Sequence, residues 1–201
     1  MGVKTNPGNF FEDFRFGQSI RHAVPRTVTA GDVALYTGLT GSRFALPSSD
    51  SFAQSLGLAR APIDDLLVFH VVFGRTVADI SLNAVANLGY AGCKFGAAVF
   101  PGDTLAASST VIGLKENSSR ETGTVYVRST GINQRGETVL DYIRWVMVRK
   151  RDSAAPAPEA NVPDLPSSVE ARDFILPRGL DLARYDTGLA GAPHLWDDFQ
   201  P

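Results

Sequence analysis

The feature that most constrains the fold is a long apolar stretch in the first half of the chain, Leu66 to Ile80. It is apolar around nearly the whole circumference of a helix, so a helix here should be buried on all sides. Its β-branched residues would also allow a strand, but a stretch of this length without a turn signal is normal for a helix. Asp64 or Asp65 offers an N-cap that suits the helix dipole. We therefore predict a buried helix that begins at this acidic pair.

Strand signals follow this helix. They cover residues 84–95, 104–114, 124–130 and 139–148, with turn signals at residues 101–103 and 133–136. The last strand is apolar on both faces except at Asp141 and Arg144, so we expect it to be central in a sheet. Shorter helices are expected at residues 33–39 and 52–56. One buried helix followed by long antiparallel strands predicts an α+β hot-dog fold, in which a curved sheet wraps around the helix.

Composition excludes several classes of protein. Hydrophobic residues make up 44% of the chain and charged residues 20%, which are globular proportions. The formal charge of -2 supplies no basic field for nucleic acid or an anionic membrane. A lone cysteine, Cys93, excludes a disulfide scaffold, and the absence of a Cys/His cluster argues against a metal site. The longest apolar run is about half of what spans a bilayer, so a soluble, cytoplasmic protein is expected.

The chain changes character after Lys150. Five of its 12 prolines stand between residues 152 and 177, where they prevent regular helix or central strand. We predict a compact domain over residues 1–151, a proline-rich linker over 152–193, and the start of a second domain at 194–201. The last assignment depends on an echo of Phe11-Glu12-Asp13-Phe14 in Trp196-Asp197-Asp198-Phe199. Chance or a common edge-strand pattern would explain the same four positions.

Several ordered motifs resemble the MaoC-like hydratases, a family of hot-dog proteins. They are Pro62-Ile63 before the helix, FPGDTL at residues 100–105 and NQRGETV at residues 133–139. Four further segments resemble one branch of that family, the bacterial mesaconyl-CoA hydratases, also called β-methylmalyl-CoA dehydratases: residues 5–14, 42–46, 141–151 and 162–166. The resemblance runs through the whole chain. It implies a protein of two hot-dog repeats, of which this chain is the first repeat plus the linker.

The resemblance also implies a chemistry. Family members add water reversibly across the double bond of an enoyl-CoA, and an Asp and a His in a pattern like Gly-Asp-x-Asn-Pro-x-His act as base and acid. Here Gly41 matches, but the Asp position holds Ser42 and the His position holds Pro47. Serine is a poor base and proline transfers no proton. We therefore expect no catalytic residue in this chain, and the resemblance places the acid–base pair in the second repeat.

The resemblance assigns binding rather than catalysis to this half. Tyr90, Lys94 and Phe95 lie on a strand that borders the coenzyme A channel in related hydratases, although Lys94 could also be a plain exposed lysine. Arg43 and Phe44 could contact the carboxylate of a branched five-carbon dicarboxylic acyl group. The expected partners are acyl-CoA and a second hot-dog repeat or another copy of the chain, with a homo-oligomer expected. No cofactor beyond the thioester substrate is expected.

Other residues have simpler interpretations. His70 is expected in the core, His22 and His194 on the surface, Asp50 within a helix cap, and Cys93 as a buried small hydrophobe. Two other functions stay open at this point. One is a stand-alone acyl-CoA-binding module, and the other is a self-sufficient thioesterase or dehydratase that uses residues not recognised above.

Overall fold

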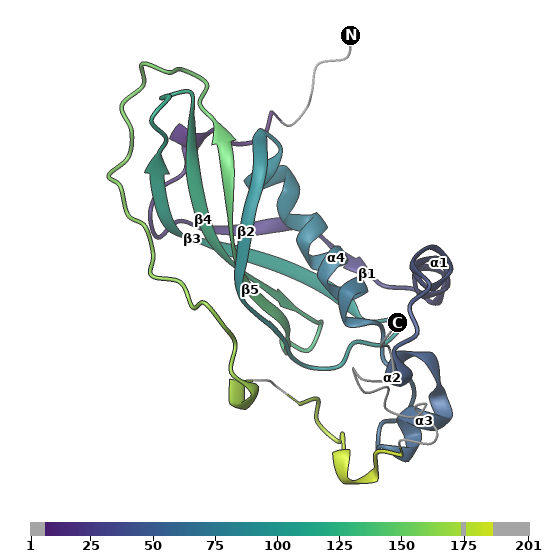
Figure 1. Ribbon diagram of the computed structural model, residues 1–201. Helices are drawn as coiled ribbons and strands as arrows, with labels where there is room; N and C mark the ends of the chain where they lie inside the picture. The colour runs from purple at the N-terminus through teal and green to yellow at the C-terminus, as the bar shows by residue number, and fades with distance from the viewer. Residues whose placement is uncertain (1–6, 174–175, 187–201) are drawn as a thin grey trace, which may run out of the picture.

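The computed structural model describes residues 7–173 and 176–186 and has the predicted α+β architecture (Figure 1). Its strands are β1 (Ser19–Thr27), β2 (Ala84–Phe95), β3 (Thr104–Glu116), β4 (Thr122–Ile132) and β5 (Thr138–Arg149). They form one antiparallel sheet in the order β1-β3-β4-β5-β2, which curves around the helix α4 (Asp65–Thr76). All four predicted strands are confirmed. Within the described ranges, no helix has the length and hydropathy that a bilayer crossing needs.

The helix α4 begins as predicted and is followed by a π-helical turn, Val77–Ser81. Asp64 is the N-cap, and its carboxylate accepts a hydrogen bond from the Leu66 N–H at 2.8 Å. One face of the helix packs into the sheet through Leu67, Val68, Val71, Val72 and Thr76. The four apolar residues among them meet Leu105, Leu140 and Tyr142 of the sheet in a single apolar cluster. Burial of this face therefore fixes the helix against the strands.

The prediction that this helix is buried on all sides is wrong. Leu66 is 47% exposed, His70 is exposed, and Phe69 and Phe73 are only partly buried. The reason is that one curved sheet covers only one side of a helix. On the other side, the side chains of Tyr36 in α1 (Ala30–Thr40) and Tyr90 in β2 contact the helix but leave it partly exposed. His70 is therefore not a core histidine, and its ring instead lies 6.1 Å from that of Tyr36.

The prediction that His22 lies on the surface is also wrong. Strand alternation turns it inward from β1, where its Nδ1 lies 2.8 Å from Asp79 Oδ2 and its Nε2 lies 2.8 Å from Ser109 Oγ. Ser109 Oγ lies 2.7 Å from Ser129 Oγ. These contacts satisfy the polar groups inside the sheet and join β1, β3 and β4 to the π-helical turn.

Within the described residues, three α-helices precede α4: α1 (Ala30–Thr40), α2 (Ala45–Ser48) and α3 (Asp50–Ser55). Two of them match the short helices that the sequence predicts, and α2 is an addition. The cap before Phe52 is Ser49, whose hydroxyl accepts the Phe52 N–H. Asp50 is the first helical residue, and its carboxylate accepts the Ala61 N–H at 2.8 Å. These helices lie beyond the N-terminal end of α4 (Figure 1).

The segment after β5 runs along the outer face of the sheet, away from α4 (Figure 1). Asn161 pairs with Leu114 through two backbone hydrogen bonds of 2.8 Å. A Cβ atom at Gly113 would lie 2.5 Å from Pro163 Cδ, so this glycine permits the close approach. Further along, the Asp181 N–H donates to the Leu56 carbonyl at 2.8 Å. The segment therefore joins the outer sheet to α3. Residues 194–201 and His194 lie outside the described ranges.

Candidate functional site

The loop that resembles the hydratase motif has no free acid or base. Gly41 ends α1 with a φ of 65°, and the Ser42 hydroxyl then donates a hydrogen bond to Asp64 Oδ2. Pro47 lies inside the short helix α2. Asp64 is 5% exposed and accepts hydrogen bonds on both carboxylate oxygens. Ser42 and Asp64 therefore hold the loop against the start of α4, which is a structural role.

Asp65 lies in a different environment. It borders a hollow of about 370 Å³ with Leu46, Pro62, Cys93, Phe95, Ala98, Leu176, Pro177 and Leu180. The carboxyl can reach solvent, yet desolvation by its surroundings, and then the charge of Asp64, raise its pKa to about 6. Burial also raises the pKa of the Cys93 thiol, as do the charges of Asp141 and Asp65. The hollow is thus apolar, with one titratable acid at its edge.

A second hollow, of about 510 Å³, lies next to the first. The two share Ala98, Leu176 and Pro177 in their walls. The second one also contains Arg135 and Arg178, with Phe100 and Leu58 as apolar wall. Arg135 is paired with Glu137 at 2.7 Å and with Asp103 at 3.1 Å. The two adjacent hollows, here together called the channel, have a charged end at Arg135 and Arg178 and an apolar end beside α4.

Arg43 and Phe44 lie in a third hollow, of about 370 Å³, together with Ser42, Asp64, Tyr36 and Leu66 among others. Both side chains are exposed. They flank the start of α4 but do not border the channel. A ligand that contacts these two residues would therefore approach α4 from a direction other than that of the channel.

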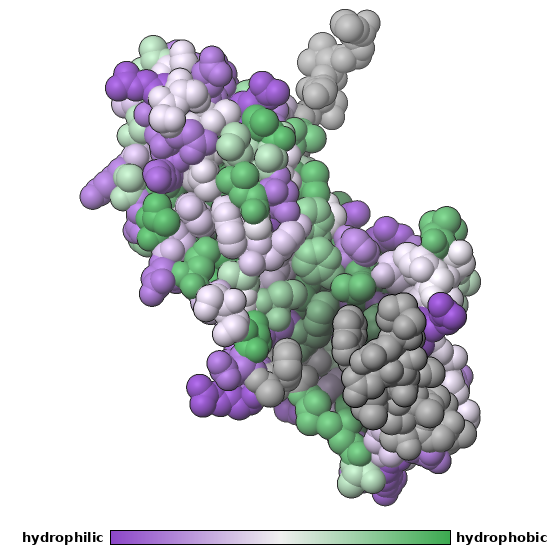
Figure 2. Space-filling view, viewed as in Figure 1, coloured by the Kyte–Doolittle hydropathy of each residue, from purple (hydrophilic) through white to green (hydrophobic). Residues whose placement is uncertain are grey.

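Tyr90 belongs to an aromatic cluster along the partly uncovered side of α4. Its ring centroid lies 5.7 Å from that of Phe69, 6.4 Å from Phe73 and 6.3 Å from Tyr142. Tyr90 itself is 43% exposed. We call the line between α4 and the edge strand β2, from Leu66 to Tyr90, the seam. Figure 2 shows apolar residues at the surface along this part of the molecule.

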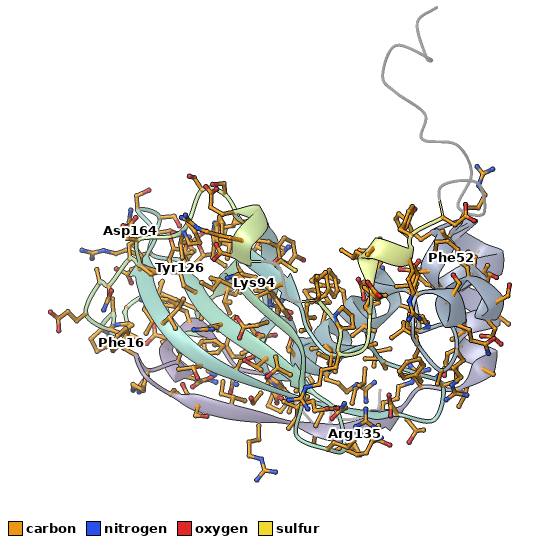
Figure 3. The ribbon with its side chains drawn as sticks, turned by 90° about the horizontal axis from the view of Figure 1, so that it is seen from below. Phe16, Phe52, Lys94, Tyr126, Arg135 and Asp164 are labelled. Carbon is orange, nitrogen blue, oxygen red and sulfur yellow. The ribbon has the colours of Figure 1, made fainter. Side chains whose placement is uncertain are left out.

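The structure separates the five binding residues that the sequence suggests. Phe95 borders the channel, Tyr90 lies at the seam, and Arg43 and Phe44 line the third hollow. Lys94 is paired in register with Asp141, whose carboxylate accepts from Arg128 on the outer face of the sheet. Figure 3 labels Lys94 on the sheet, with Arg135 at the β4–β5 turn. Lys94 therefore points away from the side that carries Tyr90 and Phe95.

Sequence reasoning missed Asp65 as a group with a perturbed pKa, and it missed the two arginines of the channel. The only local signal for Asp65 is a second carboxylate directly after an N-cap. The arginines come together only because residues 176–178 fold back beside the β4–β5 turn. Within the described ranges, no cluster of His, Cys, Asp and Glu has the arrangement that a metal ion needs.

Comparisons with known proteins agree on one family. The family model described as mesaconyl-CoA hydratase matches residues 3–179. The chain is 66% identical over 200 residues to a β-methylmalyl-CoA dehydratase of Chloroflexus aurantiacus, and 61% identical over 197 residues to a mesaconyl-CoA hydratase of Cereibacter sphaeroides. These alignments cover 100% and 98% of this chain. They cover 57% of each relative, so the chain spans little more than half of their length.

Solved structures show the same relationship. A crystal structure of a MaoC domain protein from Chloroflexus aurantiacus matches 99% of this chain and 57% of its own, with a TM-score of 0.90 and 66% identity. A Mycobacterium tuberculosis protein described as having a double hot-dog fold matches 94% of this chain and 58% of its own, with a TM-score of 0.77 and 25% identity. The fold is thus a hot-dog fold, and the chain belongs to the mesaconyl-CoA hydratase family.

Proposed function

We propose that this chain is the amino-terminal half of a two-repeat enoyl-CoA hydratase that converts mesaconyl-CoA reversibly to β-methylmalyl-CoA. Its own role is to bind the thioester substrate and shape its path, while the second repeat supplies the acid and the base. The observation that carries the proposal is that the motif loop has no acid or base, since the Ser42 hydroxyl donates to Asp64 and position 47 is a proline. The chain is nevertheless 61% to 66% identical to longer hydratases.

The reaction explains why a second repeat is required. A base removes a proton from water, the oxygen bonds to Cβ, and an acid supplies a proton to Cα. The thioester oxygen gains negative charge in between and needs hydrogen-bond donors. The start of α4 is a poor place for this negative charge, because Asp64 already caps it and Asp65 would place a second carboxylate beside the charge. We therefore assign the reacting atoms to the seam, where the second repeat can reach them.

The channel and the seam suggest a path for coenzyme A. The phosphates would lie at the outer end beside Arg178 and Arg135. The pantetheine arm would follow the apolar wall past Phe95 toward Tyr90, about 16 Å further along β2 at the usual rise per residue. The acyl group would then lie at the seam. The outer-face position of Lys94 favours its other interpretation, a strand lysine beside Asp141.

A thioesterase function has one structural argument in its favour. Asp79, His22 and Ser109 are connected in the order of a serine-hydrolase triad, with 2.8 Å at each contact. However, Ser109 is 2% exposed and its hydroxyl also contacts Ser129. A nucleophile needs room for an acyl carbon beside it, so this arrangement better suits a structural network.

The first test is to sequence the gene beyond the codon for residue 201 and to assay the full encoded protein. We expect a longer polypeptide with a second hot-dog repeat, and loss of the enoyl-thioester absorbance when mesaconyl-CoA is added. The 201-residue chain alone should not catalyse the reaction. Efficient hydration by that chain alone would contradict the proposal. A cytoplasmic location and a homo-oligomer remain predictions for the same preparation.

A further inference from the structure

Arg144 is the most unusual charged residue of the described structure. It lies on the helix-facing side of β5 and is 0% exposed. The strand that carries it is otherwise apolar on that face, with Tyr142, Val146 and Val148 as its neighbours. Burial lowers the pKa of the guanidinium, because desolvation disfavours its charged form. An arginine in this position needs hydrogen-bond acceptors or a negative charge to offset its desolvation, whereas an apolar residue would not.

The described residues compensate Arg144 only in part. Its Nη2 donates to Thr76 Oγ1 at 2.9 Å and more weakly to Ser81 Oγ at 3.4 Å. The Phe73 ring lies 4.5 Å from the guanidinium carbon. Its Nε and Nη1 are buried and have no hydrogen-bond partner, and no carboxylate of the described ranges forms an ion pair with it. Buried charges are normally paired, so a negative partner is expected.

A second unsatisfied group lies beside the first. The Tyr142 hydroxyl is buried without a hydrogen bond of ordinary geometry, although Ser129 and Thr76 are near enough to influence its pKa. Tyr142 and Arg144 are two residues apart on β5, so their side chains share the same face of the sheet. Together they offer three hydrogen-bond donors, two from Arg144 and one from Tyr142. A carboxylate can accept a charge-assisted hydrogen bond from an arginine N–H and a second hydrogen bond from a hydroxyl.

The position of these donors connects them to the seam. Tyr90 on β2 is the register partner of Arg144, and Phe73 lies over the guanidinium from α4. Arg144 therefore lies beside two members of the aromatic cluster on the partly uncovered side of α4. Arg144 lies one layer of side chains below the surface at which the acyl group is proposed to sit.

We propose that Arg144, with the Tyr142 hydroxyl, binds the distal carboxylate of a dicarboxylic acyl thioester and thereby selects such substrates over monocarboxylic ones. The inference rests on the proposed function for the placement of the acyl group. It differs from the sequence-based suggestion of Arg43, which is exposed, because an exposed arginine is solvated and gains less from binding a carboxylate. Buried hydrogen-bonding groups left unpaired by the wrong substrate discriminate strongly.

The test compares two thioesters on the protein that contains this chain and its second repeat. Mesaconyl-CoA carries the distal carboxylate, and crotonyl-CoA lacks it. In Arg144→Gln, the preference for mesaconyl-CoA, measured as the ratio of kcat/KM values, should fall on the order of 100-fold. Hydration of crotonyl-CoA should change little. Arg144→Lys keeps the charge but not the planar set of N–H donors and should lose about tenfold. It provides a second variant if Arg144→Gln does not fold.

Arg128→Gln is the matched control, because Arg128 lies on the outer face of β4 and pairs with Asp141 at 2.9 Å. It should leave the preference unchanged. Equal losses for both thioesters in the Arg144 variants would assign Arg144 a structural role and overturn the inference.

Equilibrium binding by calorimetry separates the inference about Arg144 from the proposed hydratase function. Preferential binding of mesaconyl-CoA through Arg144 without turnover would refute only the hydratase proposal, whereas turnover with an unchanged preference would refute only this inference. Failure to bind either thioester would refute both.

Discussion

A buried charged side chain lies near each end of α4, and only the one at the N-terminal end has its hydrogen bonds satisfied. At the N-terminal end, the Asp64 carboxylate accepts hydrogen bonds from the Leu66 N–H and the Ser42 hydroxyl. At the C-terminal end, Arg144 contacts Thr76 and the Phe73 ring but leaves two of its nitrogens without a partner. A satisfied buried charge serves the fold, whereas an unsatisfied one weakens it. The difference suggests that the first end is structural and the second is kept for a ligand.

The largest expected effect on stability is at the structural end. Asp64→Ala removes the N-cap and leaves the Leu66 N–H and the Ser42 hydroxyl without their acceptor. We expect the free energy of unfolding to fall by about 2 to 3 kcal/mol, measured by urea denaturation of the chain. Asp64→Asn keeps an accepting oxygen and should retain most of the stability. An unchanged urea midpoint in Asp64→Ala would mean that the cap does not hold this end of the helix.

A smaller effect of opposite sign is expected at the other end. Arg144→Met replaces a poorly compensated buried charge by an apolar side chain of similar length. We expect the free energy of unfolding to rise by about 1 to 2 kcal/mol. Thr76 keeps a partner, because its hydroxyl also donates to the Phe73 carbonyl at 2.8 Å. Strong destabilisation by this substitution would show that Arg144 already has full compensation, and the contrast between the two ends would disappear.

The sequence predicts one end of α4 better than the other. The start of the helix depends on neighbours in the chain, an acidic pair followed by an apolar run. The sequence therefore restricts the cap to Asp64 or Asp65, and the structure shows that it is Asp64. Arg144 is visible in the sequence as a charge in an apolar strand. Its isolation depends on which face of β5 meets α4 and on the groups on the opposite side, and these contacts come from residues as distant as Phe73 and Tyr90.

The same distinction applies to the rest of the fold and to the candidate site. Strands and turns follow from local patterns, and Gly136 takes the positive φ of 75° that the hairpin turn requires. His22 was misplaced because a short polar strand does not reveal which side faces the interior. The channel could not be predicted, since its walls join residues 46, 95 and 177 from three separate parts of the chain. The sequence does not predict that one side of α4 is exposed, because an apolar helix sequence indicates burial but not which partner covers each side.

The smallest expected effect on stability concerns Asp65, at the N-terminal end of α4. In the folded chain its pKa is about 6 instead of 3.8, chiefly through desolvation and then through the charge of Asp64. A raised pKa means that the folded state holds this proton more tightly than the unfolded state does. The resulting stabilisation is fully present below about pH 4 and is lost as the pH rises through about 6. Solvent access to the carboxyl keeps this effect modest.

Asp65→Asn removes this titration without changing the shape of the side chain. We expect the variant to become more stable than the unmodified chain as the pH rises from about 4 to 7, and to level off above that range, when urea denaturation is repeated at each pH. Asp103→Asn is the control of opposite sign. Burial would raise the pKa of Asp103, but hydrogen bonds from Gln134, from the Phe100 N–H and from Arg135 together lower it. Asp103→Asn should be less stable than the unmodified chain at neutral pH, and this difference in the free energy of unfolding should disappear as the pH falls below about 4. If the difference in free energy of unfolding between Asp65→Asn and the unmodified chain did not vary with pH, the pKa of Asp65 would not be raised. The hollow beside α4 would then leave this carboxyl fully solvated.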